Sequence, residues 1–154
     1  MTGFDVAYKK IDTLVPELWA EHQPDLTIHV GVSNISCIQL ETKADRESYD
    51  IVDNDQFCPA DKKHCMAGPD TITTDLDVAQ LHDKFNALEP KVAGLTAQIS
   101  NDAGKFICEY TYYTSLNCRG PSKTLFVHVP YQGFTEQEIA EGLERILDIC
   151  LKMM

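Results

Sequence analysis

Short apolar segments alternate along this chain with segments whose apolar residues recur at helical spacing. The apolar segments are 26–32, 95–99 and 124–129. The segments with helical spacing are 8–23, 75–88 and 135–151, and a further helix is expected at 105–116. Buried strands that alternate with amphipathic helices are typical of a mainly parallel sheet with helices on both faces. The sequence therefore predicts an α/β fold, a three-layer αβα sandwich.

Local signals refine this prediction at three places. Thr135 and Glu138 match a capping box and predict the start of the last helix. Pro16 lies inside the first apolar stripe and predicts a kink there or a helix that restarts at the proline. Residues 33–74 are polar and turn-rich, so we expect loop there apart from one short strand at 38–40. A loop of this length in a small domain is usually functional or disordered, and its position beside the strand ends favours function.

Composition limits the classes of partner. The 154 residues suit one domain, 1–154, and carry 24 acidic against 13 basic side chains, a net charge of −11. Such a surface repels phosphate backbones and anionic membranes, so we expect neither nucleic-acid nor membrane binding. No apolar run suits a membrane span, and the first residues lack the pattern of a secretory signal. We therefore expect a soluble cytoplasmic protein whose six cysteines are mostly free thiols.

Three side chains at or just after the ends of predicted strands suit nucleophilic catalysis. Ligand sites in open α/β sheets lie beyond the carboxyl ends of the strands. Cys108 lies in the first turns of a predicted helix after one strand, and His128 lies at the end of the next. A thiol, an imidazole and an acid that orients the imidazole form an acyl-transfer apparatus, and Glu41 is the best-placed acid. By spacing alone, core packing is the better interpretation for Cys108 and His128, and solvated surface is the better one for Glu41.

Longer motifs around these residues are more specific. They lie at 99–116, 126–130, 30–33, 40–41 and 57–59. Together they resemble the pyroglutamyl-peptidase I family, in its animal-type branch, and the likeness runs with gaps from about residue 6 to the C-terminus.

The resemblance implies a cysteine peptidase that removes N-terminal pyroglutamate from peptides. It implies that Cys108 is the nucleophile, that His128 is general base and then acid, and that Glu41 orients His128. It also implies walls of the pyroglutamyl pocket, namely Phe106, Ile107 and, less directly, Phe57. The chemistry requires no metal and no cofactor, and its partners are peptides with N-terminal pyroglutamate.

The chain departs from the family pattern in two ways. The family's first strand, its Gly-Phe-Gly-x-Phe loop and its first helix have no counterpart, although 1–4 echo the start of that loop. Gln56 also replaces a usual arginine, which removes a fixed positive charge. Both departures predict weak or absent turnover by the chain as written. The alternative function is therefore a non-catalytic or truncated paralogue that binds pyroglutamyl peptides without hydrolysing them.

A zinc module is a further alternative, because Cys58, His64 and Cys65 have suitable side chains and Cys37 offers a fourth. Six residues separate Cys58 from Cys65, more than the usual spacing of paired zinc ligands. A surface loop with unrelated thiols is the better interpretation, and we predict no metal site.

Overall fold

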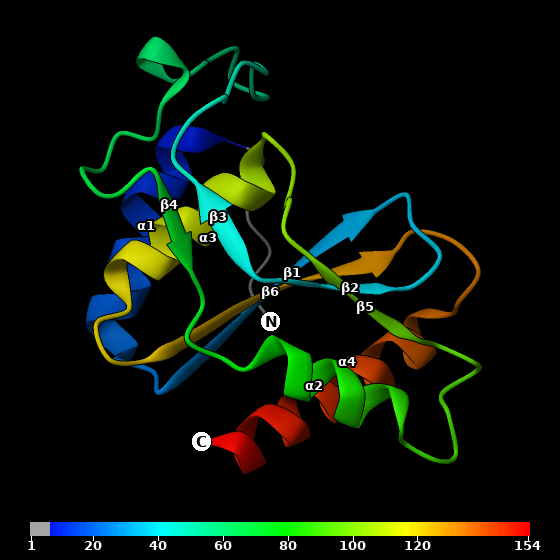
Figure 1. Ribbon diagram of the computed structural model, residues 1–154. Coiled ribbons are helices and arrows are strands. Elements are labelled where there is room, and N and C mark those ends of the chain that lie inside the picture. Colours follow the sequence, from blue (N-terminus) through cyan, green and yellow to red (C-terminus); the bar gives the residue numbers. More distant parts are fainter. Residues whose placement is uncertain (1–6) are drawn as a thin grey trace.

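A four-stranded sheet lies at the centre of the computed structural model, which describes residues 7–154 (Figure 1). In spatial order its strands are β1 (Leu26–Ser33), β6 (Lys123–Pro130), β2 (Ile38–Glu41) and β5 (Ala97–Ser100). β1 and β6 are parallel, as are β2 and β5, whereas β2 and β6 are antiparallel. Only four residues join β1 to β2, too few for the crossover that parallel strands require, so β2 returns in the opposite direction.

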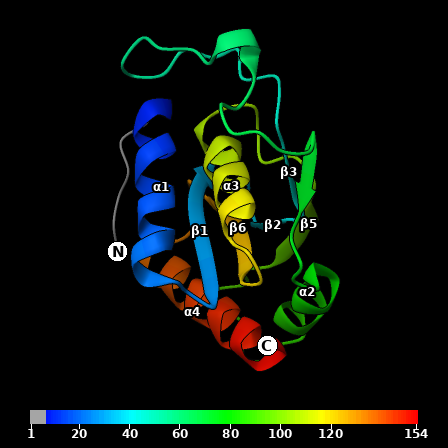
Figure 2. The ribbon, with the colours of Figure 1, turned by 90° about the vertical axis from the view of Figure 1, so that its left-hand side faces the viewer.

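Helices cover both faces of this sheet, which confirms the predicted α/β sandwich. α1 (Tyr8–His22) and α3 (Ile107–Cys118) lie on one face, and α2 (Val78–Asn86) and α4 (Glu136–Met153) on the other (Figure 1). Figure 2 shows α1 and α3 side by side. The core between the sheet and α2 and α4 is mainly aliphatic, whereas α1 and α3 meet in an aromatic cluster.

Two local predictions have different outcomes. The capping box is confirmed, because Thr135 accepts a hydrogen bond from the Glu138 amide and donates its own amide to the Glu138 carboxylate. The predicted restart at Pro16 is wrong, because α1 is one helix from Tyr8 to His22. Buried α1 side chains on both sides of the proline pack in the cluster shared with α3, and this packing outweighs the lost backbone hydrogen bond.

The long segment between β2 and α2 is more ordered than the sequence predicts. Two three-residue strands, β3 (Lys43–Asp45) and β4 (Thr71–Thr73), form an antiparallel pair. A short 3-10 turn, η1 (Ala60–Lys62), lies between them. Strands this short leave no measurable alternation in a sequence, so the pattern of residues could not predict the pairing. β3 packs against α3, and Cys108 packs against the cluster that contains Ala44 of β3.

β1 forms one edge of the described sheet, since it pairs with β6 alone. Val30 and Val32 on this strand are 45% and 60% exposed. The segment 1–4, which echoes the start of the family's N-terminal loop, lies outside the described residues. Within 7–154, no helix has both the length and the apolar character that crossing a membrane demands.

Candidate active site

The sulfur atom of Cys108 lies in the first turn of α3. The helix begins at Ile107, and its N-cap residue, Phe106, makes no side-chain capping hydrogen bond. A turn that contains Gly104 in the left-handed region, with φ 83°, leads into the helix. Cys108 is half-buried. The positive end of the helix dipole therefore faces the region of the sulfur and favours negative charge there.

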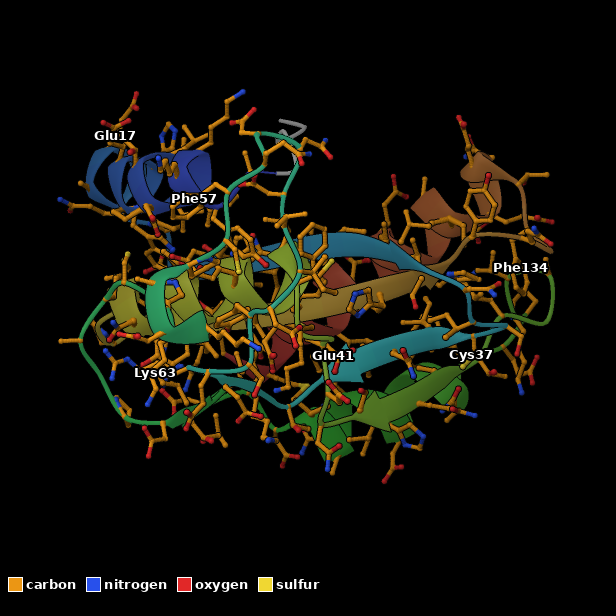
Figure 3. All side chains as sticks on the ribbon, turned by 90° about the horizontal axis from the view of Figure 1, so that it is seen from above. Glu17, Cys37, Glu41, Phe57, Lys63 and Phe134 are labelled. Atoms are coloured by element: carbon orange, nitrogen blue, oxygen red, sulfur yellow. The ribbon has the colours of Figure 1, made fainter. Side chains whose placement is uncertain are left out.

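His128 and Glu41 meet on the same face of the sheet. Glu41 pairs with Phe126 across the antiparallel β2–β6 ladder, so its side chain is a diagonal neighbour of His128. His128 Nδ1 lies 2.8 Å from Glu41 Oε1, and both side chains are buried. With Nδ1 engaged by Glu41, Nε2 is the ring nitrogen left for Cys108. Figure 3 shows Glu41 near the middle of the molecule.

The imidazole of His128 is an unusually strong base. Burial alone lowers its pKa, but hydrogen bonds and charge interactions with Cys108 and Glu41 outweigh burial and raise the pKa to about 9. The ring is therefore protonated at neutral pH and can stabilise negative charge on the neighbouring sulfur. The structure thus brings together Cys108, His128 and Glu41, the three residues that the strand ends predicted.

Gly31 is a residue of this site to which the sequence analysis assigned no role. It pairs with His128 across the parallel β1–β6 ladder. A Cβ atom at this position would lie 3.1 Å from Cys108 Sγ and 2.9 Å from the Phe126 ring. The available signal was a glycine inside an apolar strand, which often marks close approach of another group. Here the group that approaches is the Cys108 sulfur.

The predicted pocket residues share an aromatic cluster. Phe57, Phe106 and Ile107 are partly buried against it, and Tyr8 lies between the two phenylalanines, with ring centroids 5.7 Å from Phe106 and 6.4 Å from Phe57. Figure 3 shows Phe57 close to α1. Asp53 holds this arrangement, because its carboxylate accepts hydrogen bonds from the amides of Tyr8 and Phe57 at 2.8 and 2.9 Å.

Tyr8 and Asp53 were not identified from the sequence. Asp53 lies in the acidic turn 53–55, which predicts a loop but not its contact with α1. No sequence signal pointed to Tyr8.

The structure does not bring Cys58, His64 and Cys65 together as the zinc alternative required. Cys58 donates its thiol to the Tyr49 carbonyl, whereas His64 and Cys65 lie with Asp12 in a group whose ligand atoms are within 4.8 Å of one another. Both ring nitrogens of His64 already have protein partners. Nδ1 accepts from the Met66 amide at 3.1 Å, and Nε2 lies 2.7 Å from Thr114 Oγ1. A metal at this group would have to displace one of these hydrogen bonds.

A cavity of about 340 Å³ lies between α1 and β1. Its lining includes Trp19, Ile28 and His29. His29 Nε2 is buried there without a hydrogen-bond partner among the described residues, and burial lowers the pKa of this imidazole to about 4. None of Cys108, His128 and Glu41 lines this cavity.

The site combines a thiol at a helix N-terminus, a basic imidazole and a buried carboxylate on an α/β sheet. Cysteine hydrolases can use this arrangement. A family model described as pyroglutamyl peptidase matches residues 3–152. The chain belongs to this family.

Individual relatives agree with this assignment. The chain is 34% identical over 152 residues to pyroglutamyl-peptidase 1 of Rattus norvegicus, covering 97% of this chain and 71% of that protein. It is 28% identical to a pyrrolidone-carboxylate peptidase of Vibrio vulnificus, covering 96% and 73%. A mutant pyrrolidone carboxyl peptidase from Pyrococcus furiosus matches the fold with a TM-score of 0.84 at 23% identity, covering 97% of this chain and 79% of that chain.

Proposed function

We propose that this protein is a cysteine peptidase that removes pyroglutamate from the N-terminus of peptides. Membership of the pyroglutamyl peptidase family supports this function. The observation that carries it is the 2.8 Å contact between His128 and the buried Glu41, on the face of the sheet where Cys108 Sγ approaches Gly31. No other described histidine combines a buried carboxylate partner with a neighbouring thiol.

In the first half of the reaction, Cys108 Sγ attacks the carbonyl carbon of the pyroglutamyl residue. The resulting oxyanion needs preorganised hydrogen-bond donors. The N–H groups in the first turn of α3 are suited to this role, because no side chain caps that helix. The bond from carbon to peptide nitrogen then breaks, and His128 gives its proton to the departing amine. Pyroglutamate remains bound to Cys108 as a thioester.

In the second half, His128 is neutral and accepts a proton from a water molecule that attacks the thioester. The carbon–sulfur bond breaks, free pyroglutamate leaves, and the proton returns to the Cys108–His128 pair. Glu41 keeps the imidazole in the required orientation and stabilises its protonated form. All four steps use groups of the chain and water.

The aromatic cluster gives a physical basis for the choice of substrate. A pyroglutamyl ring has an apolar edge and one amide, so a small pocket with apolar walls and few polar groups can select it. We assign the walls to Phe106, Ile107 and Phe57, which lie around Tyr8 beside the start of α3. Substrates with an open N-terminal residue would bring a charged amine into these walls, which costs free energy.

The test is hydrolysis of a fluorogenic pyroglutamyl amide by the chain and by Cys108→Ala. Cys118→Ala is a matched control, because Cys118 is also half-buried and lies on the same helix. If the chain turns over, we expect weak release of the fluorophore by the chain and Cys118→Ala, none by Cys108→Ala, and none from an alanyl amide. Equal signals from the chain and Cys108→Ala would remove the catalytic assignment.

The second candidate function is binding of pyroglutamyl peptides without turnover. Gln56 favours it, because this residue stands in the loop next to Phe57 where the family usually carries arginine. The same assay, combined with calorimetric titration of a pyroglutamyl peptide, separates the two functions. Binding without product formation, at equal levels in the chain and Cys108→Ala, would support the second function over the first.

We also propose a cytoplasmic location. All six cysteines are free thiols, as expected in a reducing compartment. Fractionation of cells that express the chain, with antibody detection, tests this location, and recovery in a secreted fraction would contradict it.

A further inference from the structure

Helix α3 contacts the backbone of the acid as well as presenting the nucleophile. The Tyr112 hydroxyl donates a hydrogen bond to the Glu41 carbonyl at 3.0 Å, in a buried environment. Tyr112 itself is 0% exposed. The neighbouring amide of Thr42 donates to the Ser100 carbonyl at 2.8 Å. The peptide unit between Glu41 and Thr42 is therefore bonded at both its C=O and its N–H.

Cys108 and Tyr112 are four residues apart, so they lie on the same side of α3. The same part of the helix therefore directs a sulfur atom towards His128 and a hydroxyl group towards the backbone of Glu41. The His128 imidazole interacts with the Cys108 sulfur and with the Glu41 carboxylate. A shift of α3 relative to β2 would change both distances at once.

A second contact docks the same segment on α3. Glu109 Oε1 accepts a hydrogen bond from the Asp45 amide at 3.1 Å, only four residues beyond Glu41. The Glu109 carboxylate is fully buried and pairs with Lys105 at 3.0 Å, and Lys105 also pairs with Asp45 at 2.9 Å. Burial raises the pKa of Glu109, while Lys105 opposes this shift. Residues 41–45 are thus held against the first two turns of α3.

We propose that Tyr112 is a positioning residue for the reaction assigned above: its hydroxyl fixes the Glu41 peptide and thereby sets the Glu41 carboxylate against His128. This inference rests on the proposed function for its kinetic consequence, but its structural consequence at His128 is independent of turnover. Tyr112 touches no reacting atom in this arrangement. It acts through Glu41, and its ring packs on Phe126 with centroids 5.8 Å apart.

The test is Tyr112→Phe, which removes one oxygen atom and keeps the buried ring. Tyr113→Phe is a matched control, because Tyr113 is also fully buried and its hydroxyl donates to a backbone carbonyl, that of Pro69, at 2.7 Å. We expect Tyr112→Phe to lower kcat about fivefold with KM unchanged, the rate equivalent of one ordinary hydrogen bond. Tyr113→Phe should retain the kcat of the unsubstituted chain.

A second readout follows the imidazole of His128 by NMR of the chain with ¹⁵N-labelled histidine. Loosening Glu41 should lower the pKa of His128 from about 9 in Tyr112→Phe and leave it unchanged in Tyr113→Phe. Equal behaviour of the two variants, or an unchanged His128 pKa in Tyr112→Phe, would overturn the positioning role. If the chain proves inactive, the NMR titration still decides the inference, so its failure is distinguishable from failure of the proposed function.

Discussion

His128 and His64 are both buried histidines on the α1–α3 side of the sheet, yet their surroundings move their pKa values in opposite directions. His64 is 2% exposed and His128 6% exposed, and each contacts aromatic rings. Burial lowers the pKa of His64 to about 4, although Asp12 and the Tyr110 backbone oppose this shift. Contacts with Cys108 and Glu41 overcome the same effect at His128 and raise its pKa to about 9.

The comparison shows that burial alone does not prepare a histidine for catalysis. The partners of His64 are a threonine hydroxyl and a backbone amide, which suit a neutral ring that holds the segment between β3 and β4 on α3. The partners of His128 are a carboxylate and a thiol, which suit a charged ring that exchanges a proton. Replacing individual partners should therefore affect the two regions differently.

The largest effect is expected from Glu41→Gln, which makes the partner of His128 resemble the neutral partners of His64. Loss of the carboxylate charge should lower kcat/KM about 10²- to 10⁴-fold, as in other triads that lose the acid. It should also lower the pKa of His128, measured by NMR. Glu47→Gln is the control, since Glu47 forms an exposed pair with Lys63. Retention of full activity by Glu41→Gln would contradict the role assigned to the acid.

The pH dependence of unfolding tests the other half of the comparison. The unfolded chain protonates His64 near pH 6.5, but the folded chain does so only near pH 4, so stability is lost as the pH falls from 6.5 to 4. The loss from this residue amounts to about 3 kcal/mol. His128 has the opposite sign, and its contribution, present below pH 6.5, is lost as the pH rises through 9.

Urea unfolding at pH 7 and pH 4.5 measures the His64 contribution. His64→Gln should reduce the difference in free energy of unfolding between the two pH values. His22→Gln, at an exposed histidine, should keep the difference found for the unsubstituted chain. An identical pH dependence in His64→Gln and the unsubstituted chain would show that His64 is not held neutral by the fold.

Gly31→Ala disturbs the His128 region while leaving the surroundings of His64 intact. The added methyl group would meet the Phe126 ring and Cys108 Sγ at 2.9 and 3.1 Å. We expect a loss of about 1–3 kcal/mol in the free energy of unfolding and a clear fall in kcat, because the sulfur must move. Val30→Ala, at an exposed neighbour, is the control in both measurements. An unchanged kcat in Gly31→Ala would contradict the expected displacement of Cys108 Sγ by the added methyl group.

The smallest effect is expected from Thr114→Val, which removes the partner of His64 Nε2. An unsatisfied buried ring nitrogen should lower the free energy of unfolding by about 1–2 kcal/mol and leave kcat unchanged. Thr114→Ser keeps the hydroxyl group and should be more stable than Thr114→Val when both are measured by urea unfolding. A fall in kcat in Thr114→Val alone would show that the two histidine regions are coupled.

Sequence reasoning located the candidate site because Glu41 and His128 lie near the ends of strands and Cys108 lies in the helix after one. The strands at 26–33 and 123–130 have clear apolar patterns, and the motifs around Cys108 and His128 indicated the family. The order of the strands was beyond such reasoning, because β2 inserts between β6 and β5 in a mixed sheet. The β3–β4 pair was beyond it too, since three residues carry no period.

Other contacts of the candidate site depend on residues far apart in the sequence. Tyr112 reaches Glu41 across 71 positions, and Asp53 reaches the Tyr8 amide across 45. A tyrosine in an apolar helix looks like core packing until the position of its hydroxyl group is known. Packing alone likewise decides which face of the sheet a side chain occupies, how deeply it is buried and which groups it hydrogen-bonds.

The sequence by itself determined the α/β class, the family and the chemical groups available for catalysis, because periodicity and motifs are local properties of the chain. The tertiary structure alone decided which buried histidine is charged and which is neutral. A pKa depends on the groups within a few ångströms in space, and for His128 these come from β2 and α3, 87 and 20 residues away along the chain.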